Sequence, residues 1–550
     1  MKKSSVVAKK ITPIEESKPK SQVWAWIAVG IVLLLVAIVR IRLLSAPLER
    51  DEGEYAYAGQ LILQKIPPYS LACNMKLPGI YLAYAVIMAL FTQTTVGIHI
   101  GLMLINLAAI VLVFLLGRRI YDAYAGVFAA LAYACMTLTS SVLGFHAHAT
   151  HFIVVPALAG IMLILKAIDN HRSDLVFWSG LLLGTAFTMK QPGVFLTVFG
   201  GLYLIFGLAQ TRSVGWSGIA KRFGLYLVGA VTPFVLICVW MLATGVFTKF
   251  WFWTFTYASQ YASMLPLSTG VMMFQNSTPP ILSATVWAWV LAGLGLTALA
   301  WDKPARSKWV FTLGFFIFSF LCVCVGGYFR QHYYVTVLPA ASLLAGIGLA
   351  SMLRAVRRVE HGTYIQLAPI LIVLVAAGYY ISQQGDYLFE MTPLESSRAE
   401  YGMNPFPEAI EIAKYIEAHS SPTDTVAVVG SEPEIYFLSH RHSATGTIYV
   451  YPLMEPQPFA LQMQKDMISD IEKAKPRYLV LALIPSSWMA RPDSNMLIMN
   501  WAQTYAAKNY HPVGFTETLQ YSTQYTWGAD AAHYQPQANY YCAVFERTDK

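Results

Sequence analysis

Eleven long apolar runs constrain the fold of this chain more than any other feature of its sequence. A helix needs about 20 apolar residues to cross a bilayer, and most of these runs approach or reach that length. The runs are 24–44, 97–117, 123–144, 151–168, 174–190, 192–209, 223–243, 279–301, 308–327, 333–353 and 363–381. Charged residues make up only 12% of the chain, whereas soluble domains carry about 25%. The sequence therefore predicts a polytopic α-helical membrane protein and excludes an ordinary soluble enzyme, a disordered chain and a coiled coil.

A twelfth apolar run, 78–90, is too short to cross. At 1.5 Å per residue it would cover roughly 20 Å of the ~30 Å hydrocarbon core, so it predicts a helix at the membrane surface. If 78–90 does not cross, 19 Lys and Arg before residue 382 lie on one side of the membrane and eight on the other. Because basic loops favour the cytoplasmic side, we expect about eleven crossings of the cytoplasmic (inner) membrane, a cytoplasmic N-terminus and an extracytoplasmic C-terminus.

The charge balance changes sharply after the last apolar run. Residues 1–381 carry a net charge of +16, whereas residues 382–550 carry −8. We expect a cytoplasmic tail at 1–23, a transmembrane domain at 24–381 with an outer loop at 45–96, and an extracytoplasmic domain at 382–550. In that last domain the sequence predicts helices at 407–419, 432–439, 457–474 and 494–508, and strands at 425–429, 447–451, 478–484 and 541–545. This alternation predicts an α/β domain.

Four carboxylates lie within six residues of the first outer loop: Glu49, Asp51, Glu52 and Glu54. Residues 55–63 are predicted to form a helix, so that Asp51 or Glu52 would lie near its N-terminus, where the helix dipole favours an anion. The pattern allows two interpretations: these acids cap the helix, or one of them is a positioned catalytic acid or base.

Three basic positions lie on the same side of the membrane as these acids. Lys76 precedes Leu-Pro-Gly, Lys190 ends the fifth apolar run, and Arg330 is followed by His332 and Tyr333. A single Lys at a helix end usually extends its ammonium group to the membrane interface. Three cationic clusters beside an acidic loop favour instead a site for a lipid phosphate, whose charge they would neutralise.

Two further groups allow both a structural and a functional interpretation. His146, His148 and His151 could hold a divalent metal ion together with Glu52 or Glu54, or they could be interfacial, hydrogen-bonding histidines. In a regular helix 148 and 151 share a face and 146 does not, so metal binding would require an irregular turn. An aromatic cluster at 251–261 indicates the membrane interface or the wall of a lipid-substrate groove.

The order and sidedness of these motifs resemble a known family. The motifs are Asp51-Glu52 with Tyr55-Ala56, Lys76-Leu77-Pro78-Gly79, Lys190-Gln191-Pro192, and Arg330-Gln331-His332-Tyr333 followed by Leu338-Pro339. In these motifs the chain resembles the GT-C glycosyltransferases that use polyprenyl-phosphate donors. The more similar branch contains the protein O-mannosyltransferases and aminoarabinose transferases, and the resemblance covers nearly the whole chain.

The resemblance implies a role for each of these residues. Asp51 would be the catalytic base and Glu52 its acidic partner. The donor phosphate would be bound by Lys76, Lys190, Arg330, His332 and Tyr333. One position departs from the family: related enzymes often carry an acidic residue in the second outer loop, where this chain has His151 and no carboxylate. Either the histidines supply metal or hydrogen-bond functions there, or this member needs no metal.

We therefore expect a membrane glycosyltransferase, a hexosyl or pentosyl transferase that inverts the anomeric carbon. It would transfer a sugar from a polyprenyl-phosphate donor to a lipid, glycan or protein acceptor at the outer face of the membrane. Besides these substrates it would contact membrane lipids, and no nucleic acid. The alternative is a transporter or lipid-handling membrane protein with an outer binding domain. Charges at the membrane midplane would favour that alternative, but in this sequence the charges cluster at the outer rim.

Overall fold

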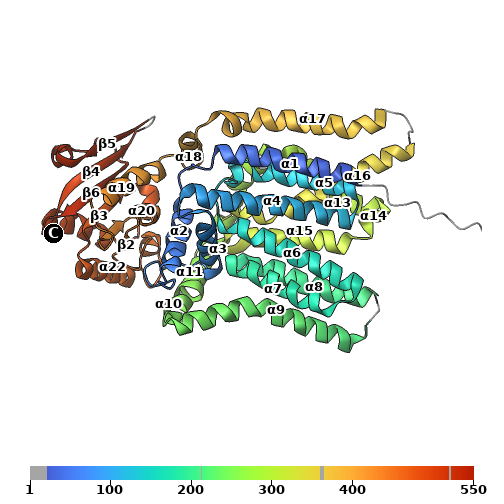
Figure 1. Ribbon diagram of the computed structural model, residues 1–550, viewed down its shortest axis with the longest axis horizontal. Coiled ribbons are helices and arrows are strands. Elements are labelled where there is room, and N and C mark those ends of the chain that lie inside the picture. Colours follow the sequence, from blue (N-terminus) through green and yellow to red (C-terminus); the bar gives the residue numbers. More distant parts are fainter. Residues whose placement is uncertain (1–21, 212–213, 360–363, 520–521, 550) are drawn as a thin grey trace, which may run out of the picture.

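A computed structural model describes residues 22–549, except 212–213, 360–363 and 520–521. It has two parts: a bundle of long helices, and an α/β domain at one end of that bundle (Figure 1). Nearly all of the predicted tail 1–23 lies outside the described residues.

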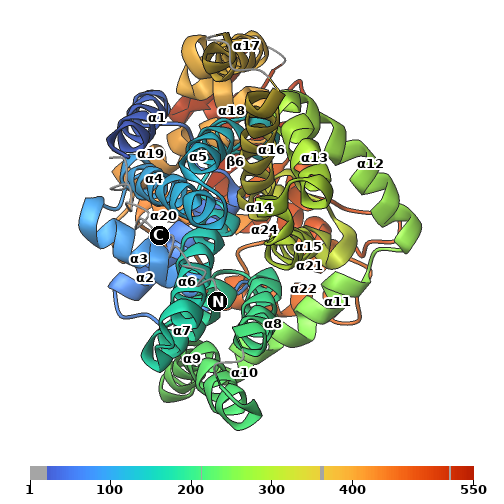
Figure 2. The ribbon, with the colours of Figure 1, turned by 90° about the vertical axis from the view of Figure 1, so that its right-hand side faces the viewer.

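The helices of the bundle correspond to the predicted apolar runs and lie side by side, as the end-on view in Figure 2 shows. They are α1 (Val23–Arg42), α4 (Thr95–Ile120), α5 (Ala123–Thr137), α6 (Ala149–Asn170), α7 (Ser173–Met189), α8 (Val194–Thr211), α9 (Trp216–Ala243), α13 (Val286–Trp301), α15 (Trp309–Cys324), α16 (Leu338–Val359) and α17 (Tyr364–Gly385). Among the described residues, seven helices are long and apolar enough to cross a membrane, or eight if one bent pair counts as a span.

Apolar side chains on the outside of the bundle support a membrane location. Leu34 on α1, Leu236 on α9 and Leu374 on α17 are 61%, 62% and 64% exposed. Such side chains are stable when they face lipid. The predicted class, a multi-pass helical membrane protein with a smaller α/β domain, is confirmed.

The predicted run 279–301 is not one straight helix. It divides between α12 (Leu267–Ala284) and α13, which meet at an angle of 98°. The buried Thr285 ends one helix and precedes the other, and its carbonyl accepts the first hydrogen bond of α13 from Ala288. Two consecutive prolines in α12, Pro279 and Pro280, also remove two backbone donors from this stretch. The remaining short helices of this region are α10 (Phe247–Trp251), α11 (Ala258–Ser263) and α14 (Lys303–Arg306).

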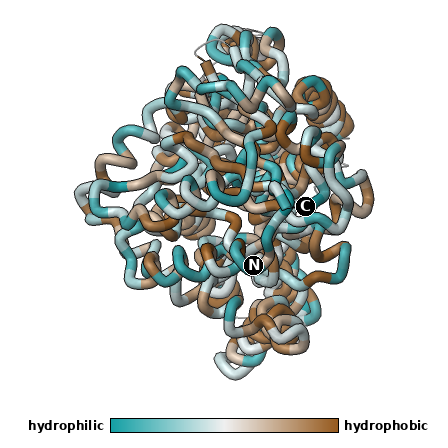
Figure 3. The backbone as a smooth tube through the Cα atoms, turned by 90° about the vertical axis from the view of Figure 1, so that its left-hand side faces the viewer, coloured by the Kyte–Doolittle hydropathy of each residue, from teal (hydrophilic) through white to brown (hydrophobic). Residues whose placement is uncertain are grey.

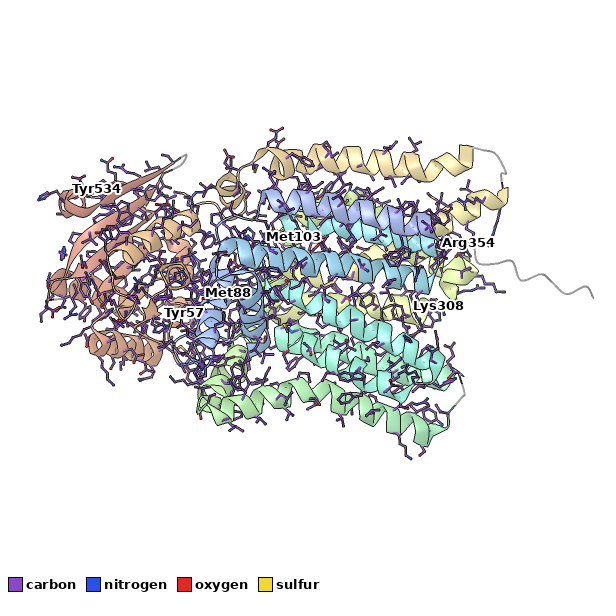
Figure 4. All side chains as sticks on the ribbon, viewed as in Figure 1. Tyr57, Met88, Met103, Lys308, Arg354 and Tyr534 are labelled. Carbon is purple, nitrogen blue, oxygen red and sulfur yellow. The ribbon has the colours of Figure 1, made fainter. Side chains whose placement is uncertain are left out.

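The predicted surface helix 78–90 forms α3 (Pro78–Phe91). It lies with α2 (Arg50–Leu63) at the end of the bundle that faces the α/β domain, where Met88 and Tyr57 are labelled in Figure 4. Lys308 and Arg354 belong to the basic loops 303–308 and 354–358, which are predicted to be cytoplasmic, and they lie at the opposite end. The acidic loop and these basic loops are therefore on opposite ends of the bundle, as the sequence predicts.

The α/β domain is built on a six-stranded mixed sheet in the order β2-β1-β3-β6-β4-β5. Its strands are β1 (Thr425–Val429), β2 (His442–Ser443), β3 (Tyr478–Leu483), β4 (Tyr510–Thr518), β5 (Thr523–Trp527) and β6 (Tyr541–Arg547). Strands β2, β1 and β3 are parallel, and the other pairs are antiparallel. Its helices are α18 (Pro393–Tyr401), α19 (Phe406–Ala418), α20 (Glu434–Ser439), α21 (Tyr451–Met454), α22 (Ala460–Ala474), α23 (Pro485–Trp488) and α24 (Leu497–Asn509).

Seen from this end of the molecule, hydrophilic and hydrophobic segments of the backbone are mixed (Figure 3). One predicted strand, 447–451, is wrong: Thr447 forms an isolated bridge to Cys73 in the outer loop, and Tyr451 begins α21. Ile448 and Val450 are buried in a cluster that contains residues of the bundle end, such as Tyr55, and of the sheet, such as Val426.

Candidate active site

The acidic loop forms the first turn of α2, which begins at Arg50, five residues before the predicted start, with Asp51 and Glu52 near its N-terminus as expected. Glu49 precedes the helix, and its Oε1 accepts a hydrogen bond of 2.9 Å from the Glu52 backbone NH. Glu52 Oε2 accepts one of 3.1 Å from the Glu49 backbone NH. This reciprocal cap satisfies two backbone donors and fixes the direction of the Asp51 side chain between them.

Asp51 contacts the first of the predicted cations. The Lys76 Nζ lies 3.1 Å from Asp51 Oδ2, and His148 Nδ1 lies 3.9 Å from the same oxygen. Burial alone would raise the pKa of the Asp51 carboxyl, but Lys76 and His148 hold that pKa well below its ordinary value. The Asp51 carboxylate is therefore ionised at neutral pH.

The Lys76-Leu77-Pro78-Gly79 motif brings the two lysines together. A Cβ at Gly79 would lie 2.4 Å from the Thr188 carbonyl oxygen, so only glycine allows α3 to start this close to the end of α7. Gln191 Nε2 donates a 2.7 Å hydrogen bond to the Met75 carbonyl across the same gap. Lys190, in the turn between α7 and α8, is thereby held beside Lys76.

Lys190 belongs to a buried cluster of basic side chains with His332 and His148. Its Nζ lies 3.5 Å from His332 Nε2 and 4.0 Å from the centre of the Tyr333 ring. The His332 ring stacks on His148, with 4.0 Å between ring centres. Burial and the Lys76 ammonium lower the pKa of Lys190 well below its ordinary value, and burial, His148 and Lys190 do the same for His332. A bound anion would relieve this repulsion.

Arg330 is placed by a strained turn. Gly326, Gly327 and Phe329 all have positive φ, at 72°, 69° and 43°, and for Phe329 this conformation is uncommon and costly. The turn directs Arg330 toward Tyr261, whose hydroxyl accepts a hydrogen bond of 3.4 Å from the guanidinium.

These residues line one cavity between the bundle and the α/β domain. Of the residues predicted to form the site, Asp51, Lys76, Lys190, Arg330, His332 and Tyr333 all face it. The far wall is formed by residues that sequence reasoning missed: Tyr449, Tyr451, Pro452, Glu455, Met489 and Arg491. They come from α21 and other segments of the α/β domain, more than 100 residues away in sequence, and no local motif marks them.

Glu52 is not brought to this cavity. Its side chain is fully buried, with Oε1 3.0 Å from His99 Nε2 and Oε2 2.8 Å from His146 Nδ1. The Ala147 backbone NH donates a further 2.5 Å hydrogen bond to Oε1. Burial would raise the pKa of Glu52, but the two histidines hold it well below its ordinary value. Through these hydrogen bonds the Glu52 carboxylate links α2 to α4 and to residues 146–147.

Glu54 also points away from the cavity. It is buried and accepts hydrogen bonds from Asn74 Nδ2 (2.7 Å) and the Tyr81 hydroxyl (2.5 Å). Burial raises the pKa of this carboxyl to about 7.

The predicted histidine trio is divided between three places. His148 lies near Asp51 and His332, and the potential ligand atoms of these three residues are within 4.8 Å of one another. His146 forms a second such group with Glu52 and His99. His151 joins neither group, so the prediction of one metal site built from His146, His148 and His151 is wrong; the irregular turn directs each ring elsewhere. His148 Nδ1 is buried without a hydrogen bond, 3.4 Å from Glu49 Oε1 and 3.9 Å from Asp51 Oδ2. The donor atoms of Asp51, His148 and His332 are of the types that bind a divalent cation.

An apolar groove begins beside the cavity. It is lined by residues of α3, α4, α6, α7 and α9, among them Leu82, Val86, Phe152, Leu236 and Trp240. Its volume is about 540 Å³. Gly79 and Met189 line it as well, close in sequence to Lys76 and Lys190, so that the polar cavity and the apolar groove are neighbours.

Comparison with known proteins identifies the class of fold. The chain is similar to ArnT from Cupriavidus metallidurans bound to undecaprenyl phosphate, with a TM-score of 0.59 and 15% identity over 96% of this chain and 98% of that one. It is also similar to the Archaeoglobus fulgidus oligosaccharyltransferase in the apo form, with a TM-score of 0.53 and 14% identity over 94% of this chain and 76% of that one. Another structure of that archaeal enzyme, in complex with an inhibitory peptide and a dolichol-phosphate, has a TM-score of 0.52.

The family comparison points in the same direction. Residues 76–242 match the family model of dolichyl-phosphate-mannose-protein mannosyltransferase. No protein with a curated function matches the sequence of this chain. The fold is therefore similar to those of ArnT and the archaeal oligosaccharyltransferase, and part of the chain matches a mannosyltransferase family model, so the resemblance noted from the sequence is confirmed. The matched segment contains Lys76, His148 and Lys190, whereas Asp51 and Arg330 lie outside it.

Proposed function

We propose that this protein transfers a sugar from a polyprenyl-phosphate donor to an acceptor, with Asp51 as the base. The observation that carries this proposal is a single cavity in which the ionised Asp51 faces Lys76, Lys190 and Arg330 beside an apolar groove. A lipid phosphate requires both: cations for its head group and an apolar surface for its chain.

In the proposed reaction, Asp51 and the basic residues of the cavity have separate roles. The Asp51 carboxylate accepts the proton of an acceptor hydroxyl or similar group, whose heteroatom attacks the anomeric carbon of the donor sugar. The bond between that carbon and the phosphate oxygen breaks, and the polyprenyl phosphate leaves with the electron pair. Lys76, Lys190, Arg330, His332 and Tyr333 bind the departing phosphate, because cations and donors placed where charge develops stabilise a transition state. Attack from the side opposite the phosphate inverts the anomeric carbon.

Glu52 has a different role in this proposal from the one the resemblance implies. Its oxygens already accept from His99, His146 and two backbone NH groups. We assign it to positioning: it fixes the first turn of α2, and with it the direction of Asp51.

We further propose that the cavity opens at the extracytoplasmic face of the cytoplasmic membrane. The basic loops at the far end of the bundle support this orientation through the bias of Lys and Arg toward the cytoplasm. The acceptor would then be an extracytoplasmic lipid, glycan or protein.

The replacement Arg330→Ala tests the donor site. Because a guanidinium binds phosphate oxygens in a fixed geometry, we expect KM for the donor to rise about tenfold or more, with a small effect on KM for the acceptor. The assay varies each substrate in turn with purified protein. Arg306→Ala, at an exposed position of α14, is the control. An effect confined to the acceptor KM would refute the phosphate-binding role.

A further inference from the structure

The wall that the α/β domain contributes to the cavity differs in chemistry from the wall opposite. The bundle side carries Asp51, Lys76, Lys190 and His332. The other side carries tyrosine rings, the Glu455 carboxylate and the Arg491 guanidinium. The proposed function gives no role to these tyrosines, to Glu455 or to Arg491.

Hydrogen bonds within the protein hold the tyrosines of this wall in place. The Tyr451 hydroxyl donates to the Ser486 carbonyl (2.6 Å), and the Tyr449 hydroxyl donates to the Arg50 carbonyl (2.8 Å). Tyr261 of α11 and Tyr328 of the turn before Arg330 line the cavity from the bundle side and stack with parallel rings, 4.4 Å between centres. These rings therefore lie at fixed positions with apolar surface at the cavity. An aromatic ring in this setting binds an apolar face of a ligand, such as the C–H face of a sugar ring.

Glu455 and Arg491 supply hydrogen-bonding groups beside these rings. Glu455 is partly buried and accepts a hydrogen bond from the Tyr257 hydroxyl. The Arg491 side chain contacts the Met264 sulfur at 3.4 Å, a weak acceptor. In the part of the chain that the structure describes, neither forms an ion pair within 4.0 Å. A carboxylate acceptor and a guanidinium donor beside fixed aromatic rings are complementary to hydroxyl groups, which both donate and accept.

We propose that Tyr451, Glu455 and Arg491, with Tyr257 and Tyr261, form a sugar subsite. The ring of a hydroxylated sugar lies against the tyrosines, its hydroxyls donate to Glu455 and accept from Arg491, and its phosphate side faces Lys76 and Lys190. This inference rests on the proposed function for the phosphate end of the cavity. It assigns the α/β domain a direct part in recognising the sugar. The sugar can be that of the donor or a sugar of the acceptor.

Binding measurements on the purified full-length protein distinguish a donor sugar from an acceptor sugar. The first arm compares undecaprenyl phosphate with a panel of the same lipid carrying a glucosyl, mannosyl or aminoarabinosyl group. The second arm measures methyl glycosides of the same sugars, with and without saturating undecaprenyl phosphate. We expect a sugar to strengthen binding in one arm, and Glu455→Gln or Arg491→Gln to reduce that gain about tenfold, in line with loss of a hydrogen bond to a charged group. Affinity for bare undecaprenyl phosphate should not change.

A control variant and the possible outcomes of this binding experiment complete the test of the subsite. Glu417→Gln changes an exposed acid of α19 outside this cavity and should leave all affinities unchanged. A loss in the first arm assigns the subsite to the donor sugar, and a loss in the second assigns it to an acceptor sugar. No gain from any sugar, or a gain that both variants retain, overturns the subsite. Failure of bare undecaprenyl phosphate to bind the unmodified protein would instead refute the proposed function.

Discussion

Asp51 and Glu52 are neighbours in the chain but lie in opposite environments. The Asp51 side chain is 23% exposed at the cavity, and that of Glu52 is fully buried. Successive residues of a helix point about 100° apart, so one acid can face a substrate while the next is used to hold the helix. The pairing of two adjacent acids in the sequence therefore does not identify two catalytic groups.

At the same scale, most of the cavity's charged residues could be predicted, whereas the arrangement of His146, His148 and His151 could not. Lys76, Lys190 and Arg330 each follow or precede an apolar run, so the sidedness of the runs placed them together. His146 and His148 lie in an irregular segment before α6, where neither helical nor strand periodicity applies. His148 directly precedes α6 and lies near Asp51, while His151 is buried in the first turn of α6.

A metal titration tests whether His148, and not His151, belongs to a metal site. Because Asp51, His148 and His332 present a carboxylate and two imidazoles within 4.8 Å, a donor set that suits Zn²⁺ or Mn²⁺, we expect one ion per chain. We expect His148→Ala to weaken its affinity at least tenfold and His151→Ala to leave it unchanged. Titration against a competing chelator measures both. Affinity that falls with His151→Ala and persists in His148→Ala would contradict this assignment.

At the scale of elements, α2 is the connection between the cavity and the α/β domain. A Cβ at Gly53 would lie 2.6 Å from the Glu434 backbone nitrogen, so α20 packs directly on the backbone of α2. The Arg50 guanidinium crosses the same contact and lies 3.1 Å from Glu432. The position of Asp51 is thus tied to the position of the α/β domain.

The replacement Gly53→Ala tests that contact. The added methyl group meets backbone atoms that cannot move aside, and overpacking of this kind typically costs 1–3 kcal/mol. We expect a lower melting temperature and faster proteolysis of the α/β domain, with a loss of transfer activity. Gly30→Ala in α1, where an added Cβ meets no atom within 4 Å, is the matched control. Equal stability of the two variants would show that α2 and α20 do not depend on this close approach.

The sequence predicts the elements well where periodicity is strong. Strand β1 has the predicted bounds, and β3 and β6 lie within two residues of theirs. Strands β4 and β5 were not predicted, because Pro512 and a register shift interrupt the first and exposed polar residues dominate the second. The run 279–301 was predicted as one crossing because hydropathy alone does not detect a 98° bend at Thr285.

At the scale of the whole molecule, the two ends of the bundle differ in what they carry. One end carries the cavity and the α/β domain, and the other carries basic loops represented by Lys308 and Arg354 (Figure 4). This polarity follows from the sequence, since the alternation of basic loops gives the side of each segment. The far wall of the cavity does not follow from it, because chain segments distant in sequence meet only in the folded protein.

Cysteine labelling of intact cells tests the absolute orientation. Asp386→Cys, at an exposed position after α17, should react with a membrane-impermeant thiol reagent, and Lys308→Cys should react only after the membrane is permeabilised. The unmodified protein controls for its six native cysteines. The reverse pattern would place the cavity in the cytoplasm and contradict the proposed topology.

The most direct test of the central claim is the rate of sugar transfer by Asp51→Asn. The amide keeps the size of the side chain but cannot accept the acceptor's proton, so we expect the rate to fall about 10²-fold or more. The measurement follows release of undecaprenyl phosphate from a lipid-linked sugar in membranes that contain the native acceptor, with Asp386→Asn as control. The account predicts this loss together with retained binding of undecaprenyl phosphate and an unchanged melting temperature. Full transfer activity in Asp51→Asn would contradict it.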